Sequence, residues 1–245
     1  MGETRNSNAR ITYSNSQDNW LLKTLQYMKS DPEILEELIN HDVAIVEGDI
    51  IMSSDRNAVV NKWPELDGHV SVPYRISSDI VKKTHDILSA MKMVSEHTCV
   101  SFHSRTTEPN YMYFKNGKGC ASHVGCIGGA QPLFIGPACM MGNICHEILH
   151  ALGFHHEHTR MDREKYITII PHNIMEGMEK NFGVKNGNTF QLPYDLTSIL
   201  HYGSDFFSAT GLPTIVATKN EPAMGQRTHM TKLDIQRVHN LYNCD

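Results

Sequence analysis

The chain has 245 residues, of which 40% are hydrophobic, enough for one large domain with a sizeable core. Its 22 Lys and Arg against 27 Asp and Glu give a net charge of −5, which argues against non-specific nucleic-acid binding because that requires a basic face. No apolar run reaches the length of about 18 residues that a membrane-spanning helix needs, so no membrane span is expected. Histidine is abundant, with 15 residues, and partly concentrated in one segment.

The N-terminal quarter of the chain gives few signals of regular structure. Residues 1–20 are polar and contain no apolar stretch typical of a signal peptide. Short helices are predicted over 20–28 and 33–39, the second beginning where the N-cap residue Asp31 precedes a proline. Residues 43–61 lack a helical period, and we interpret them as an extended connector.

The remainder of the chain mixes strands and helices. Apolar and polar residues alternate over 70–76, which predicts a strand, and three further strands are predicted at 99–102, 111–114 and 133–136. An amphipathic helix is predicted over 79–96, and two more over 143–152 and 231–242. Thr231 and Asp234 have the spacing of a capping box. The glycine-rich residues 117–129 lack the Gly-Lys-Ser/Thr ending of a phosphate-binding loop and are interpreted as a turn-rich loop.

The segment that decides the functional interpretation is His146-Glu147-Ile148-Leu149-His150-Ala151-Leu152-Gly153-Phe154-His155-His156. His146 and His150 are four residues apart, so on a helix both imidazoles lie on one face and can bind one Zn²⁺ at about 2.0–2.1 Å. Glu147 lies beside the first ligand and can act on a water without binding the metal itself.

The third ligand is expected after a chain reversal. Gly153 can adopt the left-handed conformation that ends a helix, and the three-residue spacing after it favours His156 over the adjacent His155. Three protein ligands leave a position open at the metal, which is typical of catalytic rather than structural zinc sites. The residues therefore predict a catalytic zinc ion held by His146, His150 and His156.

Six cysteines occur, at positions 99, 120, 126, 139, 145 and 244. An even number is compatible with three disulfides in an oxidising compartment, and the alternative is six reduced thiols in a cytosolic protein. No Cys-x-x-Cys pair is present, which argues against a cysteine-rich zinc knuckle.

The histidine pattern is that of the metzincin zinc endopeptidases, and its continuation, His156-Glu157-His158-Thr159-Arg160-Met161-Asp162-Arg163, resembles the signature of the astacin family. The resemblance covers residues 57–245 almost continuously, and within the family the sequence is most similar to vertebrate egg and hatching proteases. The other similar segments are Asn61-Lys62-Trp63-Pro64, Val72-Pro73-Tyr74, Ser198-Ile199-Leu200-His201-Tyr202, Gly211-Leu212-Pro213-Thr214-Ile215 and Leu241-Tyr242-Asn243-Cys244.

The resemblance implies an α+β, two-lobed metzincin fold, with a twisted upper sheet, a zinc-binding helix and an irregular lower lobe. It implies Glu147 as general base and Tyr202 as a zinc ligand at rest that swings away and stabilises the oxyanion. Glu157 resembles the family's glutamate linked through water to the buried mature N-terminus. Leu200 departs from the family, which has Met at this turn; the similar volumes of the two side chains lead us to expect a functional site.

A built-in inhibitor is also implied. Val46-Glu47-Gly48-Asp49-Ile50 resembles the propeptide switch of astacins, whose usual form begins with Phe where this chain has Val46. Asp49 would bind zinc in the latent form, and cleavage by a trypsin-like protease near Arg56-Asn57 would activate the enzyme. Residues 1–56 would then be the propeptide and 57–245 the catalytic domain, secreted and acting on protein or peptide substrates.

The family resemblance further implies the disulfides Cys99–Cys244 and Cys120–Cys139, which leaves Cys126 and Cys145 to form a third; sequence alone permits three pairings among the last four cysteines. Two other functions compete with the protease. One is a catalytically inactive zinc protein that binds an egg-coat or matrix partner, and the other is a cytosolic redox or zinc-storage protein with free thiols.

Overall fold

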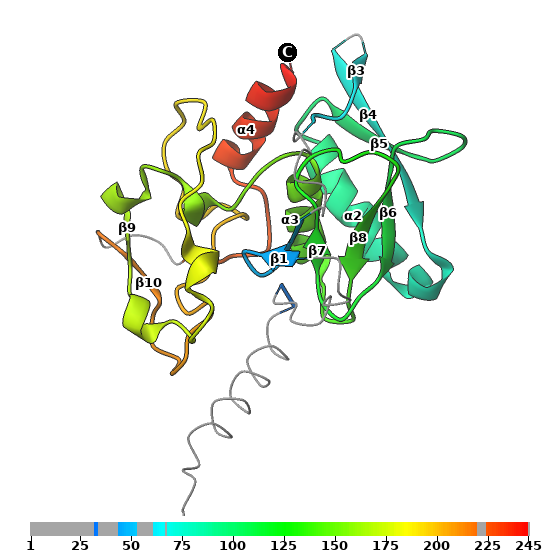
Figure 1. Cartoon of the computed structure of the whole chain (residues 1–245). Helices are drawn as coiled ribbons and strands as arrows, with labels where there is room; N and C mark the ends of the chain where they lie inside the picture. Colours follow the sequence, from blue (N-terminus) through cyan, green and yellow to red (C-terminus); the bar gives the residue numbers. More distant parts are fainter. Residues whose placement is uncertain (1–31, 34–43, 53–60, 67, 220–223, 245) are drawn as a thin grey trace, which may run out of the picture.

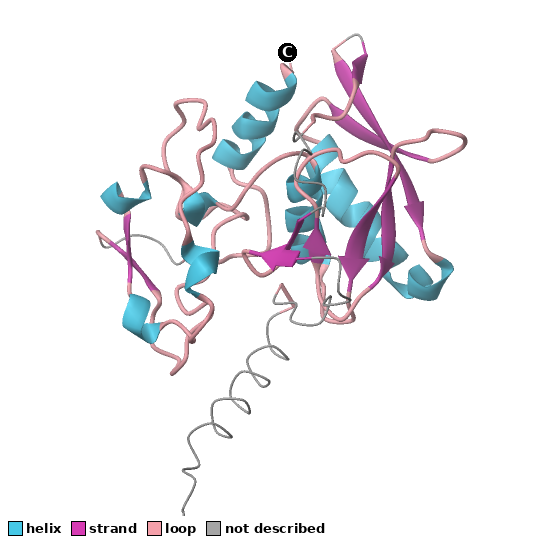
Figure 2. Cartoon of the chain, in the orientation of Figure 1, coloured by secondary structure: helices cyan, strands magenta, loops and turns pink. Residues whose placement is uncertain are grey.

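The computed structural model describes residues 32–33, 44–52, 61–66, 68–219 and 224–244. The helix predicted over 20–28, and all but residue 33 of the helix predicted over 33–39, lie outside the described residues. The described chain forms two lobes, which stand side by side in Figures 1 and 2. The lobe on the right, built from a sheet and two helices, is called the upper lobe, and the lobe of loops and short helical turns on the left is called the lower lobe.

The upper lobe is an eight-stranded mixed sheet in which β5 pairs with β4 and the others follow the order β1-β2-β7-β8-β6-β4-β3. Pairs β4–β5, β4–β6, β6–β8 and β2–β7 are parallel, while the rest are antiparallel. The strands are β1 (Ala44–Val46), β2 (Ile50–Met52), β3 (Glu65–Leu66), β4 (His69–Ile76), β5 (Val100–Ser104), β6 (Tyr111–Asn116), β7 (Ala121–Ser122) and β8 (Ala130–Ile135).

The four predicted strands are confirmed as β4, β5, β6 and β8, with ends shifted by a few residues. Two details differ from the sequence interpretation. The connector predicted over 43–61 contains the β1–β2 hairpin, and the turn-rich loop predicted over 117–129 contains the two-residue strand β7. Such short strands form because a neighbouring edge offers backbone partners, which no local pattern records.

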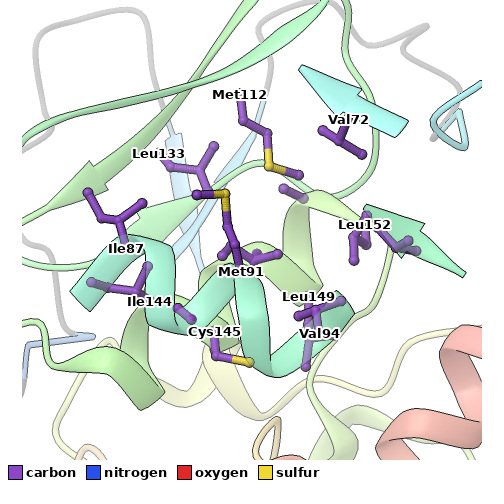
Figure 3. Close-up of a cluster of buried hydrophobic side chains, with 14 of the residues drawn as sticks. Val72, Ile87, Met91, Val94, Met112, Leu133, Ile144, Cys145, Leu149 and Leu152 are labelled. Atoms are coloured by element: carbon purple, nitrogen blue, oxygen red, sulfur yellow. The ribbon is translucent and has the colours of Figure 1, made fainter. Parts of the chain in front are cut away.

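Two helices pack against each other and against the sheet, α2 (Thr84–Ser95) and α3 (Met141–Ala151). The predicted helix over 79–96 is α2 preceded by the 3-10 turn η1 (Ser78–Lys83), which is kinked at Ile80. Figure 3 shows Ile87, Met91 and Val94 of α2 meeting Ile144 and Leu149 of α3 and the sheet residues Val72, Met112 and Leu133. This apolar contact places α3, the helix that carries the histidines.

The lower lobe contains little regular structure. Its second hydrophobic cluster is rich in aromatic side chains and includes Phe182, Tyr194, Tyr202 and Phe207. Its elements are η2 (Glu157–Thr159), η3 (Arg163–Lys165), β9 (Ile167–Ile169), η4 (Pro171–Asn173), η5 (Glu179–Phe182) and β10 (Ile215–Ala217), of which β9 and β10 pair.

The last helix, α4 (Lys232–Tyr242), returns to the upper lobe. The predicted capping box is confirmed, because Asp234 N donates to Thr231 Oγ1 and Thr231 N donates to Asp234 Oδ2, each over 3.0 Å. Tyr242 is buried in the core of the upper lobe. Cys244 is disulfide-bonded to Cys99, the residue just before β5, and this bond links the C-terminal end of α4 to the upper lobe. No helix among the described residues has the length and apolar character needed to cross a bilayer.

Two of the three predicted disulfides are present, Cys99–Cys244 and Cys120–Cys139. The predicted pairing of Cys126 with Cys145 is wrong, since both are buried free thiols. Cys145 lies on α3 within the main hydrophobic cluster, about 100° around the helix from its neighbour His146. Cys126 is held in the loop after β7, where its amide donates to Asn61 O.

Candidate metal centre

Helix α3 is buried along most of its length and carries three buried polar side chains near the predicted metal site. His146, Glu147 and His150 are all fully buried, and the rings of His146 and His150 lie 4.5 Å apart between centroids, one helical turn from each other. Placing polar groups in such a dry environment is costly unless they bind partners or a metal. The helix therefore delivers two of the three predicted ligands by its period alone.

The third ligand arrives by the chain reversal that the sequence predicted. Gly153 has φ +116°, and the chain after it brings His156 back towards α3, whereas His155 is exposed. The Nε2 atoms of His146, His150 and His156 lie 2.9, 3.1 and 3.3 Å from one another. Tetrahedral ligands at typical Zn–N distances lie about 3.3 Å apart, so the three nitrogens fit one zinc ion.

The hydrogen-bond partners of the opposite ring nitrogens select the tautomer of these histidines. Nδ1 of His146 lies 2.7 Å from Ile199 O, and Nδ1 of His150 lies 2.6 Å from Phe154 O. Nδ1 of His156 lies 2.9 Å from Glu47 Oε2. Carbonyl and carboxylate oxygens only accept, so in the neutral form of each ring the proton is on Nδ1 and Nε2 carries a lone pair. Three lone pairs that converge in a buried site need a cation between them, and imidazole nitrogen suits zinc.

A carboxylate from the N-terminal part of the chain completes this cluster. Asp49 Oδ2 lies 3.0 Å from His146 Nε2 and 3.3 Å from His156 Nε2, and Oδ1 lies 3.7 Å from His150 Nε2. Asp49 is fully buried, so its carboxylate needs a cationic partner, which a metal ion among the three Nε2 atoms would supply. The four residues together form a buried group that could hold a metal ion.

The turn between β1 and β2 carries Asp49 into the site. Val46 pairs with Ile50, which leaves a three-residue loop in which Gly48 has φ +77°. A Cβ at Gly48 would lie 2.9 Å from the Phe207 ring and 3.1 Å from Glu33 O. Only glycine therefore fits both the backbone conformation and the close contacts at this position.

Glu147 differs from the other carboxylates of the site in that neither of its oxygens has a hydrogen-bond partner in the described part of the chain. Both oxygens are nevertheless buried. Burial raises the pKa of Glu147 well above its usual value, and the nearby charges of Asp49 and Glu33 act in the same direction. A buried carboxyl with a raised pKa beside three ligands has the properties of a proton-transfer group.

Tyr202 reaches the site from the lower lobe. Its ring stacks on His158 with centroids 3.8 Å apart and meets the His156 ring edge-on at 4.7 Å. The hydroxyl donates to Glu47 O over 2.5 Å. Glu47 thus contacts two site residues, Tyr202 through its carbonyl and His156 through its carboxylate, and Lys185 Nζ lies 3.2 Å from the other carboxylate oxygen.

The turn preceding Tyr202 joins the two lobes at the metal ligands. Ile199 O accepts from His146, as described above, while Leu200 O accepts from Glu157 N over 3.0 Å. Leu200 is 2% exposed and lines a cavity of about 220 Å³ beside His156. Glu157 is paired with Arg237, whose Nη2 lies 2.6 Å from Glu157 Oε1.

Comparisons with known proteins agree with this geometry. The model of the peptidase family described as Astacin matches residues 55–243. The chain belongs to the astacin family. Its relatives include high choriolytic enzyme 1 of Oryzias latipes, 38% identical over 223 residues, which cover 86% of this chain and 82% of that protein. The zinc metalloproteinase nas-15 of Caenorhabditis elegans is 38% identical over 197 residues, covering 77% of this chain but 34% of its own length.

A solved structure shows the same fold. The hatching enzyme zinc-protease HCE-1 of Oryzias latipes superposes with a TM-score of 0.72 at 39% identity, over 75% of this chain and 95% of that chain. The astacin assignment and the two-lobed α+β fold are therefore confirmed. This chain is an astacin-family zinc metalloendopeptidase whose three-histidine zinc site is intact.

Some residues at this astacin-type site were not predicted from the sequence. Glu33 contacts both Arg227 and Asn143, and Glu47 supports His156. Glu47 lies next to the recognised Gly48-Asp49 pair, a signal that could have placed it near the metal. Glu33 gives no such signal, because its partner Arg227 is 194 residues away in the sequence.

Proposed function

We propose that this astacin is an endopeptidase made in a latent form, with residues 1–56 as inhibitory propeptide and 57–245 as catalytic domain. The observation that carries the proposal is the Asp49 carboxylate, whose oxygens lie 3.0–3.7 Å from all three Nε2 atoms. A carboxylate in that position takes the coordination site that catalysis needs. Removal of the segment by cleavage near Arg56-Asn57 would expose it.

Glu147 is assigned as general base and acid. When bound, Zn²⁺ supplies Lewis-acid polarisation of the scissile carbonyl and lowers the pKa of water. Glu147, which is buried and has no hydrogen-bond partner among the residues that the structure describes, accepts a proton from the attacking water on a carboxylate oxygen. It then passes this proton to the nitrogen of the leaving amine, so the peptide C–N bond breaks with no net proton change on the enzyme.

Tyr202 is assigned as the hydrogen-bond donor for the oxyanion that develops at the scissile carbonyl. Its hydroxyl is within reach of the site, since its ring contacts the His156 ring. In the latent arrangement this hydroxyl donates to Glu47 O instead. The propeptide would thus occupy two groups of the mechanism at once, the metal through Asp49 and the donor through Glu47.

We place the protein outside the cell, acting on extracellular proteins. The two disulfides support this location because such bonds persist in oxidising compartments. The activating enzyme is proposed to be trypsin-like, because Arg56 precedes the expected mature start. The names of the relatives speak of choriolytic and hatching activity, which makes egg-envelope proteins the first substrates to test.

The test is peptide hydrolysis by the zinc-loaded full chain before and after limited trypsin treatment. We expect activity only after the cut near Arg56, lost with a zinc chelator and lost in Glu147→Ala. The matched control is Glu176→Ala, which removes an exposed glutamate of the lower lobe and should behave as wild type. Correctly cut, zinc-loaded protein that cleaves no peptide would contradict the proposal and favour a protein that only binds its partner.

A further inference from the structure

A second carboxylate of the N-terminal segment is bound away from the three histidines. Glu33 Oε1 and Oε2 accept from Nε and Nη2 of Arg227, each over 2.6 Å, in a two-pronged ion pair. Asn143 Nδ2, in the first turn of α3, donates to Glu33 Oε1 over 2.8 Å. Three donors therefore converge on one carboxylate.

This is a built site rather than a surface contact. Glu33 is 2% exposed, and the side chain of Arg227 is 12% exposed. Arg227 is held from its other side, since Nη1 donates to His201 O and to Gln226 O, each over 3.0 Å. Asn143 is fixed in turn, because its Oδ1 accepts from Met140 N over 3.0 Å. Residues of the proposed catalytic domain thus orient both donor side chains, Arg227 and Asn143.

The backbone around Glu33 is engaged as well. Cys120 N donates to Pro32 O, next to the Cys120–Cys139 disulfide. Glu33 O packs against Gly48, because a Cβ atom added at Gly48 would lie only 3.1 Å from this oxygen. The backbone at Glu33 therefore packs close to Gly48, the residue that precedes Asp49.

We propose that Arg227 and Asn143 form a carboxylate-binding site whose occupant in the latent protein is Glu33, a second anchor of the inhibitory segment beside Asp49. The inference rests on the latency proposed above. Its consequence is that cutting the chain does not by itself release the segment. Both anchors must dissociate, because Glu33 is bound by Arg227 and Asn143 and not by the three histidines.

The sequence offers a direct way to measure this release. Trypsin cleaves after Lys29 and Arg56, and no Lys or Arg lies between them, so the fragment 30–56 carries both Glu33 and Asp49. The zinc-loaded full chain is nicked with trypsin, and fragment 30–56 remaining on the protein is followed over time by gel filtration and mass spectrometry.

We expect Glu33→Gln and Arg227→Lys each to speed loss of the fragment about tenfold or more. Gln lacks the charge, and Lys keeps the charge but cannot make the two-pronged contact. The matched control is Glu65→Gln on β3, an exposed glutamate at the other edge of the sheet, which should leave the rate unchanged (Figure 1). Wild-type release as fast as release from Glu33→Gln would overturn the second anchor.

A competition experiment removes any concern about folding of the variants. Synthetic 30–56 peptides, wild type or Glu33→Gln, are added in excess to nicked wild-type protein, and displacement of the original fragment is measured. We expect the Glu33→Gln peptide to compete about tenfold less well or worse, and equal competition would overturn the inference. Retention of the fragment needs no catalysis. If Glu33→Gln speeds fragment loss but the cut protein hydrolyses no peptide, the peptidase proposal alone is contradicted. If the cut protein hydrolyses peptide but Glu33→Gln leaves fragment loss unchanged, only the proposal of a second anchor is contradicted.

Discussion

The two lobes hold the metal site by different means. The upper lobe packs mainly aliphatic side chains between a regular sheet and helices α2 and α3 (Figure 3). The lower lobe surrounds Tyr202 with aromatic rings, among them His158, Phe182 and Phe206, on loops and 3-10 turns. The upper lobe supplies groups that share one helix, whereas the lower lobe supplies groups brought together only by folding.

This difference separates the roles of the lobes. His146, Glu147 and His150 keep their spacing as long as α3 is helical. The position of Tyr202 depends on stacking and on the turn that begins at Ser198, where Asp234 accepts from Ser198 Oγ and Ile199 N. We therefore expect metal binding to follow the integrity of the upper lobe, and turnover to follow the lower lobe.

Among the variants that compare the two lobes, the largest effect is expected from Tyr202→Phe. The ring and its stacking are retained while the hydroxyl is lost, so the fold and the zinc content should stay as in wild type. Removing one donor to an oxyanion typically costs about 10²–10³-fold in rate, and we expect kcat to fall by that amount with little change in KM. Steady-state kinetics of the trypsin-activated protein, with zinc content by atomic absorption, check this.

Tyr194→Phe serves as the matched control for the hydroxyl. Tyr194 is a buried tyrosine of the same lobe whose hydroxyl pairs with His201 Nε2 over 2.8 Å, away from the three ligands. Tyr194→Phe should lower the free energy of unfolding but leave kcat within a few fold of the wild-type value. Wild-type kcat in Tyr202→Phe, or an equal loss in both variants, would show that Tyr202 acts only by packing.

The next effect compares the two cores directly. Leu149 on α3 and Ile215 on β10 are both at most 1% exposed, and truncation of either to Ala should lower the free energy of unfolding by about 2–5 kcal/mol. Only Leu149→Ala should also weaken zinc binding, because the cavity lies in the helix that carries two ligands. Urea unfolding and competition with a zinc chelator test this. Equal loss of zinc affinity in both variants would refute the division between lobes.

The same contrast explains what the sequence could and could not predict. His146, His150 and the capping box of Thr231 and Asp234 were predictable because each depends on residues within one or two turns of a helix. The pair of Glu33 and Arg227 was not, because nothing near either residue indicates a partner 194 positions away. Strand β7 was missed because two residues pair only where β2 and β8 present edges.

The cysteines show the same limit. Family resemblance predicted Cys99–Cys244 and Cys120–Cys139, and both are present. The third pair was inferred by elimination, which assumes that leftover cysteines are neighbours in space. Cys145 is instead packed among apolar side chains on α3, where burial raises the pKa of its thiol and keeps it protonated.

A smaller effect concerns acid stability. Burial lowers the pKa of His201 to about 4, below the 6.5 of an unfolded histidine, so the unfolded chain takes up the proton more readily. His201 thus contributes fully above about pH 6.5, and its contribution is lost as pH falls towards 4. We expect His201→Gln to make the decline in unfolding free energy from pH 7 to pH 5 shallower by about 1–2 kcal/mol. His85→Gln, at an exposed histidine, is the control in urea unfolding; an unchanged slope in His201→Gln would argue against the neutral buried ring.

The smallest effect is expected from Leu200→Met, which restores the residue usual in the family at this turn. The backbone of Leu200 is held by two hydrogen bonds, its N donating to Ser198 Oγ and its O accepting from Glu157 N, and a side-chain exchange leaves both intact. Leu and Met have similar volumes, so the free energy of unfolding should change by less than about 1.5 kcal/mol, and kcat/KM by a few fold at most. Urea unfolding and kinetics of the activated protein measure both. A large rise in activity would mean that the side chain at position 200 tunes the zinc site, and the spacing of the ligands on α3 would then not be enough to explain activity.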